Sequence, residues 1–196
     1  MYQKLANAGL RIPKTIFAPM LFNGTSFQDK TFFESVIKEL GFPMVIKEAY
    51  GSFGEQVYLV HNEQEMFAKI TEIGSVPFLF QEFIDTSYGK DIRLYVVGGK
   101  VITAMMREAE HDFRANVHIG GKTYPYEPTG KEKLLAMKTA QIVGTDFAGI
   151  DLLFGEKDEP ILCEVNSNAH IKGIFDCTGI DIAEIIMEYA KGEVLG

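Results

Sequence analysis

The sequence predicts an α+β fold made of two α/β lobes, residues 1–84 and 85–196. In the first lobe, apolar runs and amphipathic stretches alternate as strand–helix–strand–strand–helix–strand between about residues 11 and 84. In the second lobe, short glycine-containing or polar turns join consecutive apolar runs, which is typical of antiparallel hairpins. A chain of 196 residues, 46% of them hydrophobic, can bury a sizeable core as one large domain or as two small lobes.

The elements of the first lobe are predicted from apolar periodicity and from residues that begin or end helices. The predicted helices are Met1–Ala8, Gln28–Leu40 and Glu63–Ile73, the last capped by Asn62. The predicted strands are Lys14–Ala18, Pro43–Tyr50, Gln56–Val60 and Phe78–Ile84. Because no capping residue precedes Met1–Ala8, we expect that the chain was cut or that a preceding element is missing.

The second lobe is predicted to be mostly antiparallel. Strands Asp91–Val97 and Lys100–Glu108 meet at Gly98-Gly99, a strong hairpin signal. A polar segment, Glu110–Gly121, follows them. The remaining predicted elements are a helix from Thr129 or Lys131 to about Val143, strands Ala148–Phe154 and Ile161–Val165, and a final helix Asp181–Lys191.

The hairpin over residues 147–168 contains two acidic side chains in an otherwise apolar ladder. If Gly155 faces Pro160, Asp151 lies directly opposite Glu164, and Asn166 shares the face of Glu164. Opposed carboxylates repel unless a cation lies between them, and oxygen ligands of this kind suit a hard divalent ion. An edge hairpin with both carboxylates in solvent explains the pattern equally well.

Composition excludes several classes of protein. The net charge is −8 and the isoelectric point is about 5.1, so a general nucleic-acid-binding surface is not expected. The two cysteines, Cys163 and Cys177, have no CxxC spacing, which argues against a disulfide framework and fits a reducing cytoplasm. No apolar run approaches the length of a membrane span, and the N-terminus does not resemble a signal peptide.

A lysine and a glycine-rich loop in the first lobe suggest phosphate binding. Lys47 interrupts a row of small apolar side chains on its strand, and a buried lysine needs an anionic partner. The loop Gly51-Ser52-Phe53-Gly54 follows, with backbone N–H groups that could cradle phosphates. Each feature has an ordinary alternative: a snorkelling lysine on an edge strand, and a simple hairpin turn.

Two further segments carry candidate binding residues. Gln81–Ile84 joins the two lobes, where the backbone of Glu82 and Phe83 could read the edge of a planar ring, although an ordinary central strand is as good an explanation. Asp91 and Arg93 share one strand face. A donor-rich cluster is expected around Asp112, and its members are Arg107, Arg114, Asn116 and His118. His111 and His118 lack the spacing of metal ligands.

Taken together, these motifs resemble the ATP-grasp superfamily, and among its members the RimK-type α-L-glutamate ligases. The resemblance extends from LANAGLRIPKT to CTGIDIAEII, and its most specific parts are QEFI at 81–84, DIR at 91–93, DFRANVH at 112–118 and EVNS at 164–167. It implies an ATP-grasp fold with the nucleotide between two lobes. It further implies a ligase in which ATP phosphorylates a carboxylate and an amine then attacks the acyl phosphate, forming an amide or peptide bond.

The resemblance also implies roles for individual residues. Lys47 would contact the α- and β-phosphates, with Gly51, Ser52, Phe53 and Gly54 closing over the triphosphate. Glu82, Phe83, Asp91, Arg114, Ala115 and Asn116 would complete the nucleotide site. Asp151, Glu164 and Asn166 would bind two Mg²⁺ or Mn²⁺ ions, and Arg107 would steady the acyl phosphate. ATP and the carboxylate and amine substrates are the expected partners, in a cytoplasmic enzyme that could be a homo-oligomer.

Two departures from the family pattern affect this interpretation. A further nucleotide-contacting lysine is expected before Met1, together with an N-terminal domain, and Lys4 is in the wrong register to replace it. After Asn166 the run Ser167–His170 replaces the usual Ser-Pro-Gly or Asn-Pro-Gly turn, which leaves the acceptor open; His170 and Lys172 are candidates to touch it. An Mg-ATP-binding module without ligase activity is the alternative function.

Overall fold

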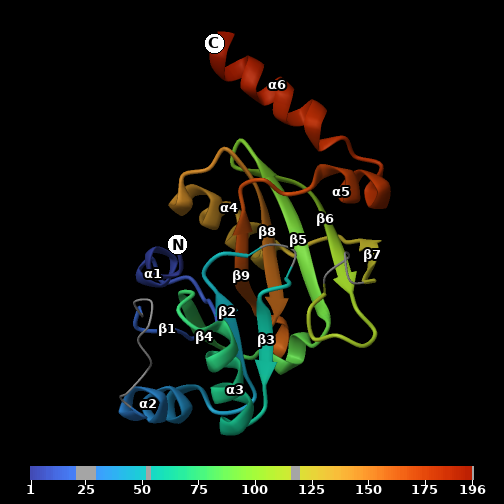
Figure 1. Cartoon of the computed structure of the whole chain (residues 1–196). Coiled ribbons are helices and arrows are strands. Elements are labelled where there is room, and N and C mark those ends of the chain that lie inside the picture. Colours follow the sequence, from blue (N-terminus) through green and yellow to red (C-terminus); the bar gives the residue numbers. More distant parts are fainter. Residues whose placement is uncertain (21–29, 52–53, 116–119, 196) are drawn as a thin grey trace. The chain divides into compact units, whose positions relative to one another are not determined.

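A computed structural model describes residues 1–20, 30–51, 54–115 and 120–195, and Figure 1 labels their helices and strands. The chain forms two compact units, one of residues 13–83 and one that combines residues 1–12 with 84–196. Each contains one antiparallel sheet with helices, so the predicted α+β class is confirmed. None of the described helices is long and apolar enough to cross a membrane.

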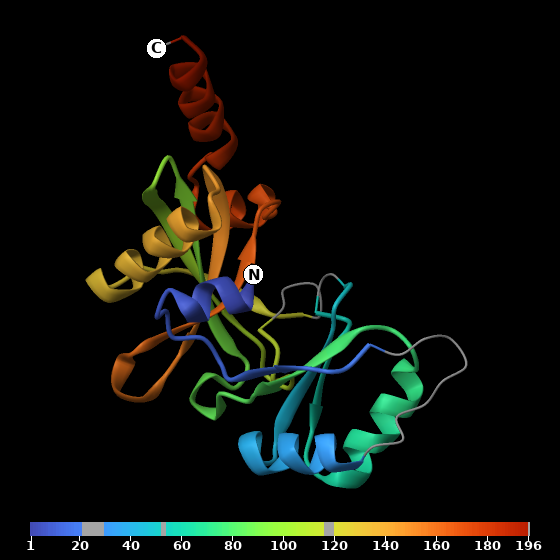
Figure 2. The same ribbon diagram turned by 90° about the vertical axis from the view of Figure 1, so that its left-hand side faces the viewer.

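The smaller unit is a four-stranded sheet with two helices on one face. The strand order is β1-β4-β2-β3, and the strands are β1 (Thr15–Phe17), β2 (Met44–Glu48), β3 (Val57–Val60) and β4 (Phe78–Glu82). Helices α2 (Lys30–Leu40) and α3 (Glu63–Ile73) bury their apolar side chains against the same sheet face, and Figure 2 shows the two helices beside each other. The core residues on that face include Ile46, Phe80, Phe33 and Met66.

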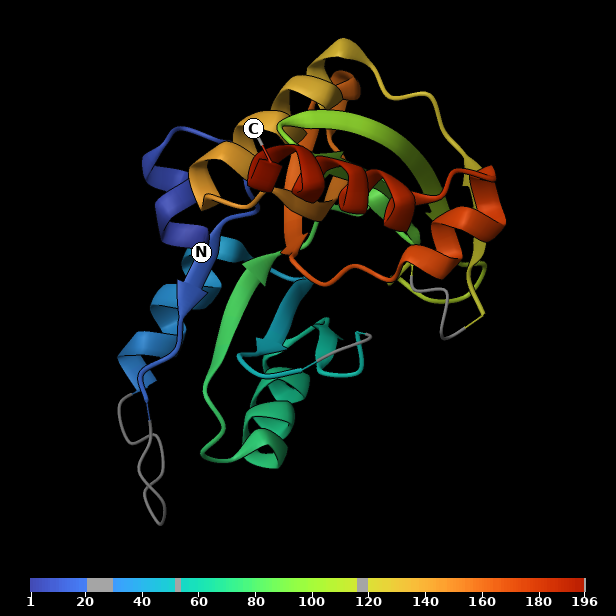
Figure 3. The same ribbon diagram turned by 90° about the horizontal axis from the view of Figure 1, so that it is seen from above.

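The larger unit is a five-stranded sheet in the order β7-β6-β5-β8-β9. Its strands are β5 (Lys90–Val97), β6 (Lys100–Glu108), β7 (Lys122–Pro125), β8 (Phe147–Phe154) and β9 (Pro160–Asn166). Its helices are α1 (Tyr2–Asn7), α4 (Gly130–Val143), α5 (Ile171–Thr178) and α6 (Ile182–Leu195), with 3-10 turns at Asp85–Ser87 and Glu156–Asp158. Helix α4 packs on one face of this sheet and the first turns of α6 contact the other face; Figure 3 shows both helices from above.

The two faces of the larger sheet differ in character. One face carries Ile92, Leu94, Ile150, Leu152 and Leu162, which form the main core with α4 and α1. The opposite face packs against α5 at one end through a small cluster of Tyr95, Met105, Ile174 and Ile182. Beside that cluster the side chains become charged. The strand alternation of this sheet therefore separates a core face from a polar face.

Local sequence signals predict several elements correctly. The side chain of Asn62 accepts a hydrogen bond from the backbone N–H of Glu65 at 2.9 Å, which begins α3 as predicted. Thr129 and Glu132 form a reciprocal capping box at the start of α4. Gly98 and Gly99 have φ values of 55° and 73°, as the tight β5–β6 turn requires. The first two residues predicted for α2 lie outside the described residues.

Other elements differ from the predictions. Helix α5 and strand β7 were not predicted, and α6 continues to Leu195 rather than ending at Lys191. Helix α1 belongs to the larger unit, although we expected it in the first lobe. Leu5 is fully buried in the core beneath α4, and the hydroxyl of Tyr2 donates to the carbonyl of Cys163 at 3.0 Å. These contacts come from residues distant in sequence, which local patterns do not reveal.

Candidate active site

Strands β5, β6, β8 and β9 bring six of the polar residues singled out by the sequence to one face of the larger sheet. The pairing places Asp91 opposite Arg107, Arg93 opposite Asp151, and Asp151 opposite Glu164. Asn166 shares the face of Glu164 two residues further along β9. The pairing of Asp151 with Glu164 confirms the prediction.

The reason given for that pairing is wrong, however. Phe154, not Gly155, faces Pro160, which would shift Asp151 by one position. A β-bulge restores the register, because the ladder shifts between Asp151 and Leu152 and leaves Cys163 as the additional residue of β9. A bulge beside charged side chains re-aims them, and here it places Glu164 against Asp151.

Four of these side chains form a continuous ion-pair network. Arg93 binds Asp151 with both ends of its guanidinium fork, Nε to Oδ1 at 2.6 Å and Nη2 to Oδ2 at 2.7 Å. Arg107 binds Asp91 in the same way, with both distances 2.6 Å. Nη2 of Arg107 also lies 3.0 Å from Oδ2 of Asp151 and links the two pairs. Bidentate pairs of this kind are strong and fixed in orientation.

The network is buried and electrically balanced. The side chains of Asp151, Arg107, Asp91 and Arg93 are 4%, 10%, 13% and 14% exposed, respectively. Burial opposes ionisation of Asp151, but the adjacent guanidiniums of Arg107 and Arg93 outweigh it and lower the pKa of this carboxyl to about 2. For Asp91 burial prevails, and the pKa of its carboxyl is raised despite Arg107. Two carboxylates and two guanidiniums cancel in charge, which makes their burial tolerable.

Gly149 makes room for this network. A Cβ atom at position 149 would lie 3.3 Å from Cδ of Arg93 and 2.6 Å from Cβ of Ala169. The first distance is tight and the second is a clash. A glycine is therefore required where the stem of Arg93 and the segment after β9 both approach β8.

Asp151, Glu164 and Asn166 fit a divalent metal ion by their chemistry. Two carboxylates and an amide are the hard oxygen ligands that Mg²⁺ and Mn²⁺ prefer. Nδ2 of Asn166 lies 3.1 Å from Oδ2 of Asp151, and Glu164 is exposed to solvent directly across the ladder. No described histidine, cysteine or acidic side chains gather in a group of three that could hold a metal, so the amide of Asn166 would have to complete this set.

The predicted cluster around Asp112 is only partly formed. Arg114 binds Asp112 through Nε at 2.9 Å and Nη2 at 2.7 Å, and its backbone N–H donates to the same carboxylate. Arg107 was wrongly expected there, because its guanidinium is bound to Asp91 and Asp151. Ala115 is buried, and Asn116 and His118 lie outside the described residues.

The remaining predicted nucleotide contacts belong to the smaller unit. Lys47 is half-buried on β2, on the sheet face opposite the helices. A Cβ at Gly51 would lie 2.5 Å from Oε1 of Gln56, and Gly54 has a φ of 73°, so both glycines are required by the turn itself. Ser52 and Phe53 lie outside the described residues. The carboxylate of Glu82 accepts from the backbone N–H of Lys14 at 2.9 Å, and Phe83 follows directly.

Arg93 is the site residue whose partner the sequence did not reveal. The pattern placed it on the same strand face as Asp91, yet gave it no role. The signal that could have identified it is the combination of two strand registers, because Arg93 faces Asp151 on β8 just as Asp91 faces Arg107 on β6. Only knowledge of which strands are neighbours reveals that combination.

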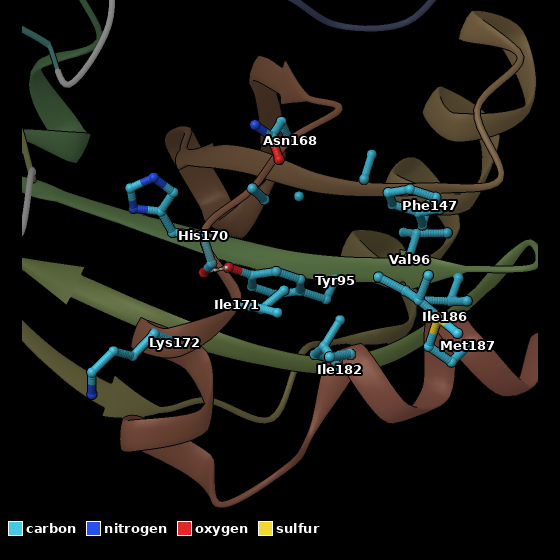
Figure 4. A pocket seen from close by; sticks show the side chains of 15 residues that line it. Tyr95, Val96, Phe147, Asn168, His170, Ile171, Lys172, Ile182, Ile186 and Met187 are labelled. Atoms are coloured by element: carbon cyan, nitrogen blue, oxygen red, sulfur yellow. Dashed lines mark hydrogen bonds between the residues drawn. The ribbon is translucent and has the colours of Figure 1, made fainter.

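A separate cavity of about 460 Å³ lies between β5, β8 and the helices α5 and α6 (Figure 4). Its walls are chiefly apolar and include Val96, Phe147, Ile182 and Ile186. The hydroxyl of Tyr95 donates to the backbone carbonyl of His170 at 2.6 Å. In Figure 4 the imidazole of His170 and the amine of Lys172 point away from the cavity, and Lys172 pairs with Asp176. This lining does not complement a nucleotide.

Comparison with known proteins identifies the family. The model of the RimK-like ATP-grasp domain matches residues 2–190. This chain belongs to the RimK-like ATP-grasp family. It is 38% identical over 193 residues to a probable alpha-L-glutamate ligase of Vibrio atlanticus, covering 96% of this chain and 61% of that protein. It is 32% identical over 192 residues to N-acetylaspartylglutamate synthase A of Mus musculus, covering 96% of this chain and 49% of the synthase.

Solved ATP-grasp ligases share the fold. The ATP-grasp ligase PsnB, in complex with a phosphomimetic variant of a minimal precursor, Mg and ADP, matches with a TM-score of 0.73 at 21% identity, over 98% of this chain and 57% of PsnB. The D-alanine–D-alanine ligase of Bacillus anthracis matches with a TM-score of 0.72 at 16% identity, over 96% of this chain and 64% of the ligase. This RimK-like ATP-grasp chain spans about three fifths of the first bacterial relatives it matches.

Proposed function

We propose that this chain is the ATP-grasp portion of a ligase that joins a carboxylate to an amine through an acyl phosphate. Lys47 and the 51–54 loop would bind the phosphates of the nucleotide. Glu82, Phe83, Asp91, Arg114, Ala115 and Asn116 would complete the nucleotide site. Family membership supports the reaction class, and the main supporting observation is the buried network of Asp91, Arg107, Asp151 and Arg93 beside Glu164 and Asn166.

The reaction would proceed in two displacements. An oxygen of the substrate carboxylate attacks the γ-phosphorus of ATP, the bond to the β-phosphate oxygen breaks, and ADP leaves. The amine nitrogen of the acceptor then attacks the acyl carbon, inorganic phosphate leaves, and the nitrogen loses a proton. Two Mg²⁺ or Mn²⁺ ions, held by Asp151, Glu164 and Asn166, would supply charge neutralisation on the phosphoryl group.

The side chains of this protein would orient the reacting groups and supply positive charge to the phosphates. Arg107 lies directly beside Asp151 and presents a guanidinium that suits the oxygens of an acyl phosphate. Asp91 holds Arg107 through both Nε and Nη2, which orients the guanidinium. Lys47 adds a positive charge on β2 for the triphosphate.

Glutamate is the amino acid we propose for ligation, since bacterial relatives are named alpha-L-glutamate ligases. The rate of ADP release, measured with a mixture of acceptors, should then rise more on addition of glutamate than on addition of other amino acids. Stimulation by a different amino acid would contradict the assignment of glutamate as substrate. ATP binding without any stimulated turnover would favour the alternative, an Mg-ATP-binding module.

That the protein is cytoplasmic and that it forms a homo-oligomer remain predictions.

The binding site can be tested by calorimetric titration of the chain with a non-hydrolysable ATP analogue, with and without Mg²⁺. We expect binding that strengthens with Mg²⁺, and loss of that Mg²⁺ dependence in Glu164→Gln. Glu159→Gln is the matched control, because Glu159 is another acidic residue of the same hairpin and pairs with Lys131. Equal Mg²⁺ dependence in the wild type and Glu164→Gln would contradict the metal assignment.

A further inference from the structure

The carboxylate of Asp151 already has cationic partners at both oxygens. Oδ1 accepts from Nε of Arg93, and Oδ2 accepts from Nη2 of Arg93 and from Nδ2 of Asn166, with Nη2 of Arg107 3.0 Å away. A divalent ion must use one of these oxygens as a ligand. Three donors already surround Oδ2, so an ion that takes Oδ2 as its ligand must displace at least one of them.

Charge leads to the same conclusion. Asp91 and Asp151 balance Arg93 and Arg107 in a site where each side chain is less than a sixth exposed. Addition of a divalent ion next to Asp151 with both guanidiniums in place would leave unbalanced positive charge in a buried site. Repulsion between like charges is strong at these distances when water is excluded.

Of the two arginines, Arg93 is the one whose ion pair is with Asp151 and not with Asp91. Arg107 is held on Asp91 by two bonds of 2.6 Å and meets Asp151 only through Nη2. Among the described residues, Asp151 is the only carboxylate that forms an ion pair with Arg93.

We propose that Arg93 competes with the divalent ion for Asp151. In the metal-free protein the guanidinium of Arg93 neutralises this carboxylate and keeps it buried. On metal binding Arg93 leaves Asp151 and presents its charge to the same polar face, where an anionic substrate group can accept from it. Arg93 is thus a positioning residue that couples metal occupancy to anion binding. This inference rests on the proposed function, since it uses the predicted metal ligands.

The proposed competition predicts the direction in which Mn²⁺ affinity changes when Arg93 is replaced. Replacement of Arg93 by glutamine removes the competitor and a nearby positive charge, so Mn²⁺ should bind the variant more tightly than the wild type. We expect a gain of about tenfold or more, the scale of a charge-assisted hydrogen bond. If Arg93 only orients Asp151, the same substitution weakens Mn²⁺ binding or leaves it unchanged. Either of those results overturns the proposal.

The full chain is titrated with Mn²⁺ alone, and electron paramagnetic resonance measures the concentration of free Mn²⁺ at each step. Lys131→Gln is the matched control, since it removes the same charge from α4, on the opposite side of the sheet, and should leave Mn²⁺ affinity unchanged. If Arg93→Gln does not fold, Arg93→Lys replaces it, because lysine cannot form the bidentate pair. Its Mn²⁺ affinity should exceed that of the wild type, and an equal or lower affinity overturns the proposal.

The outcomes separate this inference from the proposed function. In one outcome, the wild type binds Mn²⁺, Glu164→Gln weakens that binding, and Arg93→Gln does not strengthen it. That outcome would show that only the proposed competition is wrong. If neither the wild type nor Arg93→Gln binds Mn²⁺, the metal assignment is wrong and the competition falls with it.

Discussion

Asp151 and Glu164 face each other across β8 and β9, yet only Asp151 is buried. The cations that relieve the buried carboxylate in this structure are the guanidiniums of Arg93 and Arg107. The two acidic residues of this pair thus differ in their exposure to solvent. One is part of a charge-balanced interior network, and the other lies at the solvent edge. Substitutions at the two positions should have different consequences.

We predict that Asp151→Asn destabilises the metal-free protein by about 3 kcal/mol, because it leaves two buried guanidiniums with one carboxylate. Glu164→Gln should change the free energy of unfolding by less than about 0.5 kcal/mol, as is usual for exposed positions. Urea denaturation of the two variants measures the difference. Equal stabilities would contradict the structural role of the network.

A second prediction concerns the close approach of Gly149 and Ala169. Gly149→Ala should destabilise the protein by about 1–3 kcal/mol, because the added methyl group would lie 2.6 Å from Cβ of Ala169. The double variant with Ala169→Gly removes that clash and should recover most of the loss in the same urea measurement. If the double variant is as unstable as the single one, the destabilisation comes from the contact with Arg93, the other neighbour of position 149.

The role of Lys47 can be tested by ATP affinity. Lys47→Ala should weaken binding of the ATP analogue by about 1.5–3 kcal/mol, the scale of a hydrogen bond to a charged group. Lys14→Ala is the control, because Lys14 is an exposed lysine of the same unit that pairs with Glu39. Calorimetry that finds a wild-type affinity for Lys47→Ala would place this lysine outside the nucleotide site.

The role of Arg107 predicts a separation of binding from turnover. Arg107→Lys keeps one positive charge but loses the bidentate fork, so it should lower the rate of ligation while ATP affinity stays near that of the wild type. Steady-state kinetics together with calorimetry of the ATP analogue test this. A fall in affinity equal to the fall in rate would mean that Arg107 anchors the nucleotide instead.

Several features of this protein could be predicted because their causes are local. Asn62 and Thr129 begin helices through bonds to residues three positions away, and Gly98-Gly99 closes a hairpin through its own backbone conformation. The family motifs are likewise short runs of sequence. Their interpretation as an α+β ATP-grasp chain is confirmed by the family model and by the fold of solved relatives.

Other features depended on contacts between distant segments. The first helix joined the larger unit because Leu5 fits the core beneath α4, more than a hundred residues further along the chain. The register of Asp151 was predicted correctly for a wrong reason, since the bulge at Cys163 compensated for a turn one residue longer than expected. Helix α5 was missed because it is short and its first residues lack a side-chain cap.

The sequence by itself determined the family, most helices and strands, and which residue types could bind phosphate and metal. These follow from local backbone preferences and from short motifs. The tertiary structure decided which charges meet. Arg93 and Arg107 neutralise Asp151 because β5 lies between β6 and β8, and strand order depends on the burial of a whole sheet face rather than on any single run of residues.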